Sequence, residues 1–331
     1  MAAVVIAGWV VGCGSDGAET VDEVTVPDGY DVTEIATDLT GPTQIVRAPD
    51  GRLLAAHLNG GEGSTNGQVL AIDDDDESTV LFEGLRKPTG VAVVGDEIWV
   101  MEERRLSRGQ LDGGDLEVVL DELPYNGRSE GTLTATPDDR LLYNTSGTVR
   151  DKAAADGSGT LWSLTPGGEP EPVATGFKHA YARTYDDAGT LWQTEMSDGS
   201  YDGQPAPDEL VAVEPGDDFG WPSCIGDRQP VEEFDGTEER CADTPRSHAV
   251  FEPGATPTSV AVAPWDPDTL LVALWNRGEV VEMPRQESDG PVEASAFLTG
   301  IEHPQHLLAD DDRLLVVDFD GGRILAVERS D

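Results

Sequence analysis

The feature that most constrains the fold of this chain is a short unit that recurs six times. Each unit contains an apolar strand with alternating side chains, a turn rich in aspartate or glycine, and a second apolar strand. The turns with their second strands occupy residues 49–56, 95–101, 137–143, 187–192, 266–272 and 311–317. A third strand follows in most units, at 67–72, 159–164, 208–213, 278–283 and 322–327, and in a weaker form at 105–111. Alternation bounded by such turns predicts β-strands throughout, and no stretch has sustained helical periodicity.

The spacing of the units selects the architecture. Successive turns lie about 42 to 49 residues apart, which is the length of a four-stranded propeller blade. One interval is about 80 residues, and its excess is a loop that contains Cys224 and Cys241. Six blades that close into a ring leave no exposed sheet edge, and residues 30–35 are suited to supply the strand that closes the last blade. A β-sandwich is the alternative, but sandwiches do not repeat this regularly. The sequence therefore predicts an all-β, six-bladed β-propeller over residues 29–331.

The charge balance is extreme, with 65 acidic residues against 21 basic ones and a net charge of −44. The acids are spread along the whole chain, which argues against a simple acidic tail. In molar salt the Debye length falls to about 3 Å, so repulsion among carboxylates is screened while they keep the surface hydrated. We therefore expect halophilic adaptation. Such a surface repels phosphate backbones, and this excludes nucleic acid as a partner.

Residues 1–13 have the character of a lipoprotein-type signal segment. Their apolar run is too short to span a bilayer but has the length of a signal-peptide core. Val10-Val11-Gly12-Cys13 resembles a lipobox, in which the chain is cleaved before a cysteine that is then lipidated. A buried N-terminal strand is the alternative, and it fits poorly with the polar stretch that follows. We expect export, a flexible acidic linker over 14–28, and attachment through Cys13 to the extracellular face of the cell membrane.

Two cysteines remain once Cys13 is set aside. Cys224 and Cys241 form an even pair in a chain that is expected in an oxidising compartment. A disulfide between them is favoured over two free thiols, and neither their spacing nor their neighbours indicate a metal site.

Several motifs occur in an order that is more specific than any one of them. Residues 191–199 read Leu-Trp-Gln-Thr-Glu-Met-Ser-Asp-Gly, followed by Pro-Asp-Glu-Leu at 207–210 and Gly-Asp-Asp-Phe-Gly-Trp-Pro-Ser-Cys at 216–224. Weaker matches lie at 39–45, 49–51, 275–277 and 300–306. Over nearly the whole chain after residue 28, this order resembles the soluble glucose/sorbosone (aldose sugar) dehydrogenases that use pyrroloquinoline quinone (PQQ). Taken alone, the Phe-Gly-Trp-Pro turn is equally consistent with an aromatic wedge between blades.

The resemblance implies an oxidation that depends on PQQ and calcium. In that family the C1 hydroxyl of an aldose gives a proton to a base and a hydride to C5 of the quinone, while Ca²⁺ polarises the quinone oxygens. Calcium prefers hard oxygen ligands. The resemblance assigns the metal site to Ser197, Asp198, Asp208 and Glu209, with Glu195 on the same acidic turn and with the backbone carbonyls of Ser197 and Asp198 closest to the family's ligands. The alternative is that these are ordinary surface residues of an acidic chain.

The resemblance weakens at the catalytic base, for which the candidates are His179, Lys178 and Arg128. Arg128 stands where the family has a histidine, and an arginine, whose guanidinium keeps its proton at ordinary pH, cannot act as a base. Lys178 replaces an arginine that stabilises the reduced cofactor, and His179 supplies an imidazole beside it. In one interpretation His179 takes the proton, while Arg128 and Lys178 bind carboxylates of PQQ or of an acidic substrate; the resemblance adds Asn276 and Arg277 to the cofactor site. In the other, the site is degenerate and the propeller is a binding module.

Three other histidines, His57, His303 and His306, are weaker candidates, because a lone histidine on a strand is usually a packed or surface residue. The expected function is an exported dehydrogenase that oxidises a small-molecule sugar or alcohol and passes the electrons to an external acceptor. We expect it to touch the membrane only through its lipid anchor. A non-catalytic propeller that binds carbohydrate or protein is one alternative. A metal-dependent lactonase is another, and the motifs at 207–210 and 221–224 argue against it.

Overall fold

The protein is described by a computed structural model over residues 21, 24–61, 63–73, 78–128, 130–197, 199–286 and 289–330. Within these residues six four-stranded antiparallel sheets account for most of the chain. The predicted signal segment, with Cys13, and most of the predicted linker lie outside the described residues. None of the helices in the described part is long and apolar enough to cross a membrane.

The six sheets follow one another along the chain as the blades of a propeller, as predicted. Blade 1 contains β2 (Pro42–Arg47), β3 (Leu53–His57), β4 (Gly67–Ile72) and β5 (Ser78–Leu85). Blade 2 contains β6 (Gly90–Val94), β7 (Glu97–Met101), β8 (Leu106–Gln110) and β9 (Glu117–Leu120). Blade 3 contains β10 (Thr134–Ala135), β11 (Leu141–Thr145), β14 (Thr160–Leu164) and β15 (Glu171–Thr175).

The second half of the ring repeats this order. Blade 4 contains β16 (Ala180–Tyr185), β17 (Leu191–Glu195), β20 (Asp208–Val213) and β23 (Ser247–Phe251). Blade 5 contains β24 (Pro257–Ala263), β25 (Asp266–Leu274), β26 (Glu279–Pro284) and β27 (Ser295–Thr299). Blade 6 contains β28 (Pro304–Asp310), β29 (Arg313–Asp318), β30 (Arg323–Arg329) and β1 (Tyr30–Ala36). First strands of neighbouring blades contact each other, except that β16 contacts β11 of blade 3, and β28 returns to β2, so the ring is closed around an axis.

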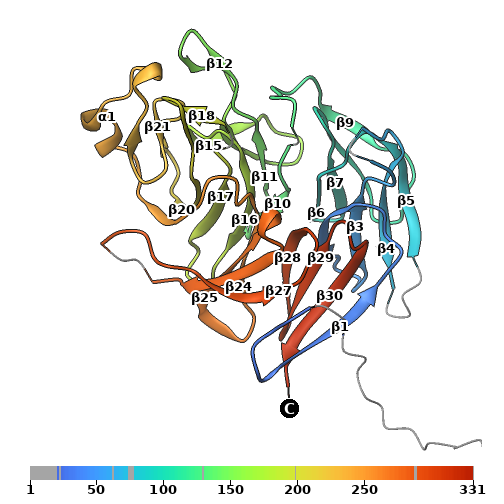
Figure 1. The fold of residues 1–331 in the computed structure, drawn as a ribbon. Helices are drawn as coiled ribbons and strands as arrows, with labels where there is room; N and C mark the ends of the chain where they lie inside the picture. The colour runs from blue at the N-terminus through green and yellow to red at the C-terminus, as the bar shows by residue number, and fades with distance from the viewer. Residues whose placement is uncertain are drawn as a thin grey trace, which may run out of the picture.

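Closure of the ring depends on the predicted N-terminal strand. β1 pairs antiparallel with β30 from Tyr30↔Arg329 to Ala36↔Ile324, with one irregularity in the register. Figure 1 shows this blue strand beside the red C-terminal strand, so the last blade is built from both ends of the described chain. The pairing removes the edge that β30 would otherwise present to solvent.

The core lies between blades rather than inside one layer. Successive side chains of a strand point to opposite faces, and here both faces are buried. In β7, for example, Ile98 packs in a cluster with blade 1 and Trp99 packs in a cluster with blade 3. The same holds in β29, where Leu314 faces blade 5 and Leu315 faces blade 1. Near-continuous apolar second strands are therefore required by the architecture.

Near the axis, threonine hydroxyls of blades 1, 2, 3 and 5 each bond to the following blade. Thr43 Oγ1 donates to the Pro88 carbonyl (2.9 Å), and Thr258 Oγ1 donates to the Pro304 carbonyl (2.7 Å). Thr89 and Thr132 make the corresponding bonds to the carbonyls of the following blades. Thr43 and Thr258 lie in first strands, and Thr89 and Thr132 lie one and two residues before first strands, so this set forms an axial collar.

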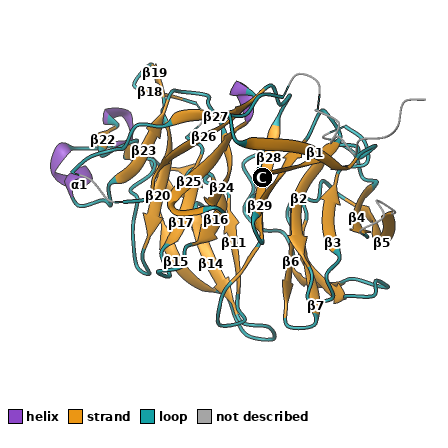
Figure 2. Cartoon of the chain, turned by 90° about the horizontal axis from the view of Figure 1, so that it is seen from below, coloured by secondary structure: helices purple, strands orange, loops and turns teal. Residues whose placement is uncertain are grey.

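Within the described residues, helix occurs only as short segments between strands, as Figure 2 shows. The long loop between blades 4 and 5 carries β21 (Cys224–Ile225), β22 (Gln229–Pro230), the 3₁₀ turn η1 (Glu232–Phe234) and α1 (Glu238–Ala242). Two further hairpins, β12 (Val149–Arg150) with β13 (Ala153–Ala154) and β18 (Ser200–Tyr201) with β19 (Gln204–Pro205), and the 3₁₀ turn η2 (Trp275–Arg277) extend from loops between second and third strands.

The collar leads to a stability prediction. Thr43→Val keeps the shape of the side chain but leaves the Ala56 and Pro88 carbonyls without their hydroxyl donor. We expect the free energy of unfolding to fall by about 1 to 3 kcal/mol, because a buried acceptor loses its partner. Denaturant unfolding in high salt measures this, with Thr79→Val on the exposed strand β5 as the matched control. Equal stability of the two variants would contradict a structural role for the collar.

Candidate active site

One end of the propeller axis holds a pocket of about 380 Å³ to which all six blades contribute. Thr43, Thr89, Tyr181, Thr258 and Gln305 line it from the axial ends of first strands. Loops that enter these strands, and loops that join second to third strands, surround them. Blades 4 and 6 interrupt the threonine pattern, and there Gln305 Nε2 donates to the Tyr181 hydroxyl. This bond links two blades within the pocket wall.

The pocket brings together three of the predicted site residues. Arg128, His179 and Asn276 line it from blades 3, 4 and 5. Arg128 lies on the loop into β10, and His179 immediately precedes β16. Asn276 lies in η2, where its Nδ2 donates to the Gly254 carbonyl and to Thr256 Oγ1, both at 2.9 Å. These contacts fix the amide at the pocket edge.

Two other predicted residues lie beside the pocket. The side chain of Lys178 is not part of its lining, although the backbone N–H of Lys178 donates to Glu195. Arg277 is also absent from the lining, and its guanidinium pairs with Glu252 on the neighbouring loop. Sequence reasoning missed Lys87, which lines the pocket and donates from Nζ to the Arg128 carbonyl at 2.8 Å. Its signal was its rarity, since the chain has only three lysines, and its place directly before Pro88 and Thr89.

The pocket differs sharply in charge from the rest of the molecule. Although 65 of the 331 residues are acidic, none of the described residues that line the pocket is aspartate or glutamate. Its ionisable lining consists of Lys87, Arg128, His179 and Tyr181. In a chain with a net charge of −44, this lining favours a ligand that carries negative charge.

His179 is held by contacts on two sides. Its backbone N–H donates to both carboxylate oxygens of Glu195, each at 3.1 Å. Its imidazole packs edge-on against the Tyr181 ring, with centroids 5.3 Å apart. Because Tyr181 is itself bonded to Gln305, the position of the imidazole depends on three blade-forming strands.

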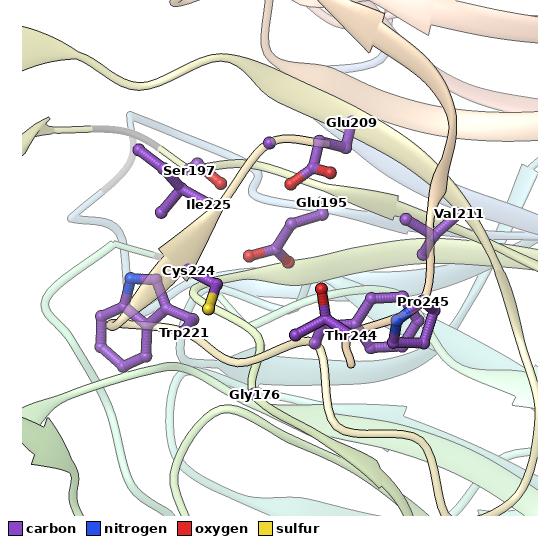
Figure 3. A pocket seen from close by; sticks show the side chains of 12 residues that line it. Gly176, Glu195, Ser197, Glu209, Val211, Trp221, Cys224, Ile225, Thr244 and Pro245 are labelled. Carbon is purple, nitrogen blue, oxygen red and sulfur yellow. The ribbon is translucent and has the colours of Figure 1, made fainter. Parts of the chain in front are cut away.

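Next to the His179 segment, the buried carboxylates of Glu195 and Glu209 face a cavity of about 10 Å³, which is room for one water or ion (Figure 3). Glu195 ends β17, and Glu209 lies in β20, where it accepts a hydrogen bond from Ser247 Oγ. Burial raises the pKa of Glu209 to about 7. Burial, and the neighbouring charge of Glu209, also raise the pKa of Glu195 well above its usual range. Two carboxyl groups placed in this way are suited to sharing a cation or to holding protons.

Asp208 has a different environment. Its Oδ1 accepts from the Ser197 backbone N–H (2.9 Å), and its Oδ2 accepts from the Thr256 backbone N–H (2.8 Å). The carboxylate therefore clamps a loop of blade 4 to a loop of blade 5. Of the other predicted ligands, Ser197 and Glu209 line the small cavity, and Asp198 lies outside the described residues. In the part of the chain that the structure describes, no three His, Cys, Asp or Glu side chains gather as metal ligands.

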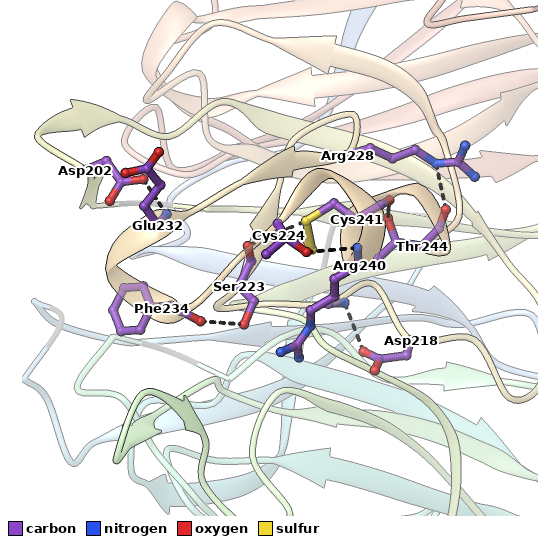
Figure 4. The surroundings of a disulfide bond; sticks show 12 residues. Asp202, Asp218, Ser223, Cys224, Arg228, Glu232, Phe234, Arg240, Cys241 and Thr244 are labelled. Atoms are coloured by element: carbon purple, nitrogen blue, oxygen red, sulfur yellow. Dashed lines mark hydrogen bonds between the residues drawn. A yellow bond between two sulfur atoms is a disulfide. The ribbon is translucent and has the colours of Figure 1, made fainter.

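The long loop covers the small cavity. Cys224 and Cys241 are joined by a disulfide, and Cys224 is part of the cavity lining. Figure 4 shows the bonds that hold the loop around it, in which Ser223 Oγ donates to the Phe234 carbonyl and Thr244 Oγ1 donates to the Cys241 carbonyl. The disulfide thus fixes one wall of the chamber that contains Glu195 and Glu209.

The three weaker histidine candidates lie outside the pocket lining. His57 bonds to Gln68 Oε1 at 2.9 Å, and burial lowers its pKa. His306 is fully enclosed, and burial lowers its pKa to about 3, so it is neutral. His303 stacks on Trp275, and its Nδ1 contacts the Asp320 carboxylate.

Comparison with known proteins identifies the fold. The sequence matches no protein-family model and no curated protein. The PQQ domain of pyranose dehydrogenase from Coprinopsis cinerea is similar over 95% of this chain and 99% of its own, with a TM-score of 0.77 and 16% identity. PQQ-bound aldose sugar dehydrogenase from Streptomyces coelicolor matches 92% of this chain and 100% of its own, with a TM-score of 0.71 and 20% identity. A Trichoderma reesei enzyme of carbohydrate-active family AA12 matches 96% and 100%, with a TM-score of 0.78 and 15% identity. At these identities the likeness shows a shared six-bladed fold.

A buried acid near Arg128 generates a pH prediction. Glu130 is fully buried, Ser146 Oγ donates to one of its oxygens at 2.9 Å, and burial raises its pKa from 4.5 to about 8. Between pH 4.5 and 8 the unfolded chain has lost this proton while the folded chain keeps it. Stability therefore falls as pH rises, by about 1.4 kcal/mol per unit. We expect Glu130→Gln to flatten this part of the stability curve, measured by denaturant unfolding at several pH values. The exposed Glu328→Gln serves as control, and equal slopes in both variants would refute the assignment.

The clamp by Asp208 generates a second prediction. Asp208→Asn replaces one acceptor oxygen with an N–H group that faces a backbone N–H. We expect a loss of about 1 to 3 kcal/mol in unfolding free energy without added calcium, because a backbone N–H loses its acceptor. Thermal unfolding measures this, with Asp312→Asn as an exposed control of the same charge change. Equal stability of the two variants would contradict the clamp.

Proposed function

We propose that this chain is a divergent PQQ- and calcium-dependent sugar dehydrogenase, which oxidises the C1 hydroxyl of an aldose or another alcohol and passes electrons to an external acceptor. The observation that carries the proposal is the axial pocket, where cationic side chains replace the acids that dominate the rest of the chain. The proposal includes export and anchoring by lipid at Cys13, on the extracellular face of the membrane.

The lining of the pocket suits an anionic quinone. When bound, PQQ supplies the hydride acceptor, and the protein supplies orientation and electrostatics. Arg128 and Lys87 line the pocket from adjacent blades and are suited to pair with quinone carboxylates. In this proposal Lys178 adds positive charge from the rim, Asn276 contributes a polar edge, and Arg277 holds its loop by pairing with Glu252.

Calcium fits the acidic turn between β17 and β20. In this proposal the backbone carbonyls of Ser197 and Asp198, which match the family's ligands most closely, would bind the ion. Glu209 and Glu195 supply carboxylates whose raised pKa values indicate that a positive charge would offset their burial. Asp208 holds the backbone of this turn in place through its bond to the Ser197 N–H.

His179 is the proposed base. It lines the pocket and can accept a proton on a ring nitrogen, whereas the guanidinium of Arg128, at the position matched to the family's histidine, has no acceptor atom. An imidazole nitrogen of His179 would accept the hydroxyl proton as hydride leaves carbon. Glu195 fixes the backbone of this residue, and Tyr181 fixes the ring. The arginine at position 128 is also the observation that favours the second candidate, a propeller that binds sugar without oxidising it.

The test is reconstitution in high salt with PQQ and CaCl₂, followed by dye reduction with a panel of aldoses. We expect turnover that requires the quinone. We expect His179→Ala to lower kcat by about 10² to 10⁴, because proton transfer by a positioned base contributes that much. The affinity for PQQ, measured by calorimetry, should change little.

The matched control is His57→Asn, which removes an imidazole outside the pocket and should leave kcat unchanged. Unchanged turnover in His179→Ala would reject the base. Sugar binding without dye reduction in the unaltered protein would reject the oxidoreductase and support the binding propeller. Opening of a lactone without quinone would indicate a lactonase.

A further inference from the structure

The pocket has two chemically different walls. Lys87 and Arg128 contribute positive charge from blades 2 and 3, whereas Trp275 and Phe319 contribute aromatic rings from blades 5 and 6. In a ring of six blades, blade 2 lies opposite blade 5 and blade 3 lies opposite blade 6. The cationic wall and the aromatic wall therefore face each other across the axis.

The aromatic wall is rigidly supported. The imidazole of His303 stacks on the indole of Trp275, with centroids 4.4 Å apart and an interplanar angle of 18°. Since His303 does not line the pocket, it supports the indole from outside. Its Nδ1 contacts the Asp320 carboxylate, so the supporting ring is itself oriented. Phe319 packs at 4.9 Å from Trp275, inclined at 60°.

Backbone contacts complete this support. The Trp275 N–H donates to the Thr256 carbonyl at 3.0 Å, and the Phe319 N–H donates to the His303 carbonyl at 3.0 Å. The Phe319 ring packs against Gly41, where a Cβ would lie only 3.1 Å from the ring, so a side chain at position 41 would crowd it. The indole is therefore ordered before any ligand arrives, which reduces the entropy lost on binding.

We infer that Trp275 is a stacking platform for the pyranose ring of a neutral sugar. Binding of the sugar does not depend on catalysis, and only its later oxidation rests on the proposed function. A pyranose has an apolar C–H face and a polar edge of hydroxyls. Trp275 meets the apolar face, and Thr256 and Gln305 in the same lining offer polar partners for the edge. The charged wall is left to the carboxylates of the cofactor, so the sugar needs no charge of its own.

Binding of sugar to the cofactor-free protein tests this inference without any turnover. We expect D-glucose or cellobiose to bind, measured by calorimetry in high salt, and Trp275→Ala to weaken that binding at least tenfold. Trp275→Phe should retain an intermediate affinity, because a smaller ring still stacks. Sorbitol has similar hydroxyls but no ring face, and its binding should respond little to either variant. The affinity for PQQ should be the same in all three proteins.

The control is Trp265→Phe, which alters an indole in the turn between β24 and β25 that packs against Tyr30 and Phe297. The inference is overturned if the unaltered protein binds no pyranose, if Trp275→Ala keeps full sugar affinity, or if it loses PQQ affinity to the same extent. Failure of the proposed function is a separate result. It would appear as absent dye reduction while sugar binding still depends on Trp275.

Discussion

Every blade of this propeller buries both of its faces, and the rest of the structure depends on that constraint. Consecutive residues such as Ile98 and Trp99, or Leu314 and Leu315, belong to different interfaces. No blade can satisfy both interfaces without a neighbour on each side, so the ring must close. Pairing of β1 with β30 supplies the closure and joins the two ends of the chain in one sheet. A closed ring in turn creates an axis, and the pocket exists because six first strands end there.

The axial pocket obtains two of its polar side chains from the blades that depart from the threonine repeat. Four blades place threonine at the axial collar, and its hydroxyl is used to bind the next blade. Blades 4 and 6 place Tyr181 and Gln305 there instead, and these residues line the pocket and bond to each other. The structural bonds of the collar thus leave two positions whose side chains can serve a ligand. His179, two residues before Tyr181, is positioned by the same departure from the pattern.

Much of this arrangement can be predicted from the sequence, because blade spacing and alternation are local signals. The six repeats, the closing strand and the placement of Arg128, His179 and Asn276 in loops at one end all follow from order along the chain. The direction in which a loop side chain points cannot be predicted from that order. Asn276 lines the pocket while its neighbour Arg277 pairs with Glu252 outside it, and no periodicity separates the two.

The other contacts that the sequence does not indicate have the same physical origin. Lys87 reaches the pocket because its Nζ meets the carbonyl of Arg128, 41 residues later and on the next blade. The assignment of Asp208 to a metal stays a prediction, and the structure adds that its two oxygens accept backbone N–H groups from two blades. Contacts between blades join residues that are far apart in sequence, so only the closed ring reveals them.

The charge balance gives a physical reason for the proposed recognition, in which direct ion pairs are combined with stacking. The excess of acids underlies our expectation that the protein works in molar salt, where the Debye length is about 3 Å and attraction over longer distances is screened. Under those conditions a cationic pocket cannot draw in its ligand from solution by steering, and it recognises carboxylates only in direct contact. Apolar contacts are not weakened by salt in this way, and excluded salts strengthen them. The stacking that we propose for Trp275 would therefore retain its strength in salt that screens long-range electrostatics, and since Trp275 lines the axial pocket it requires no change in the acidic outer surface.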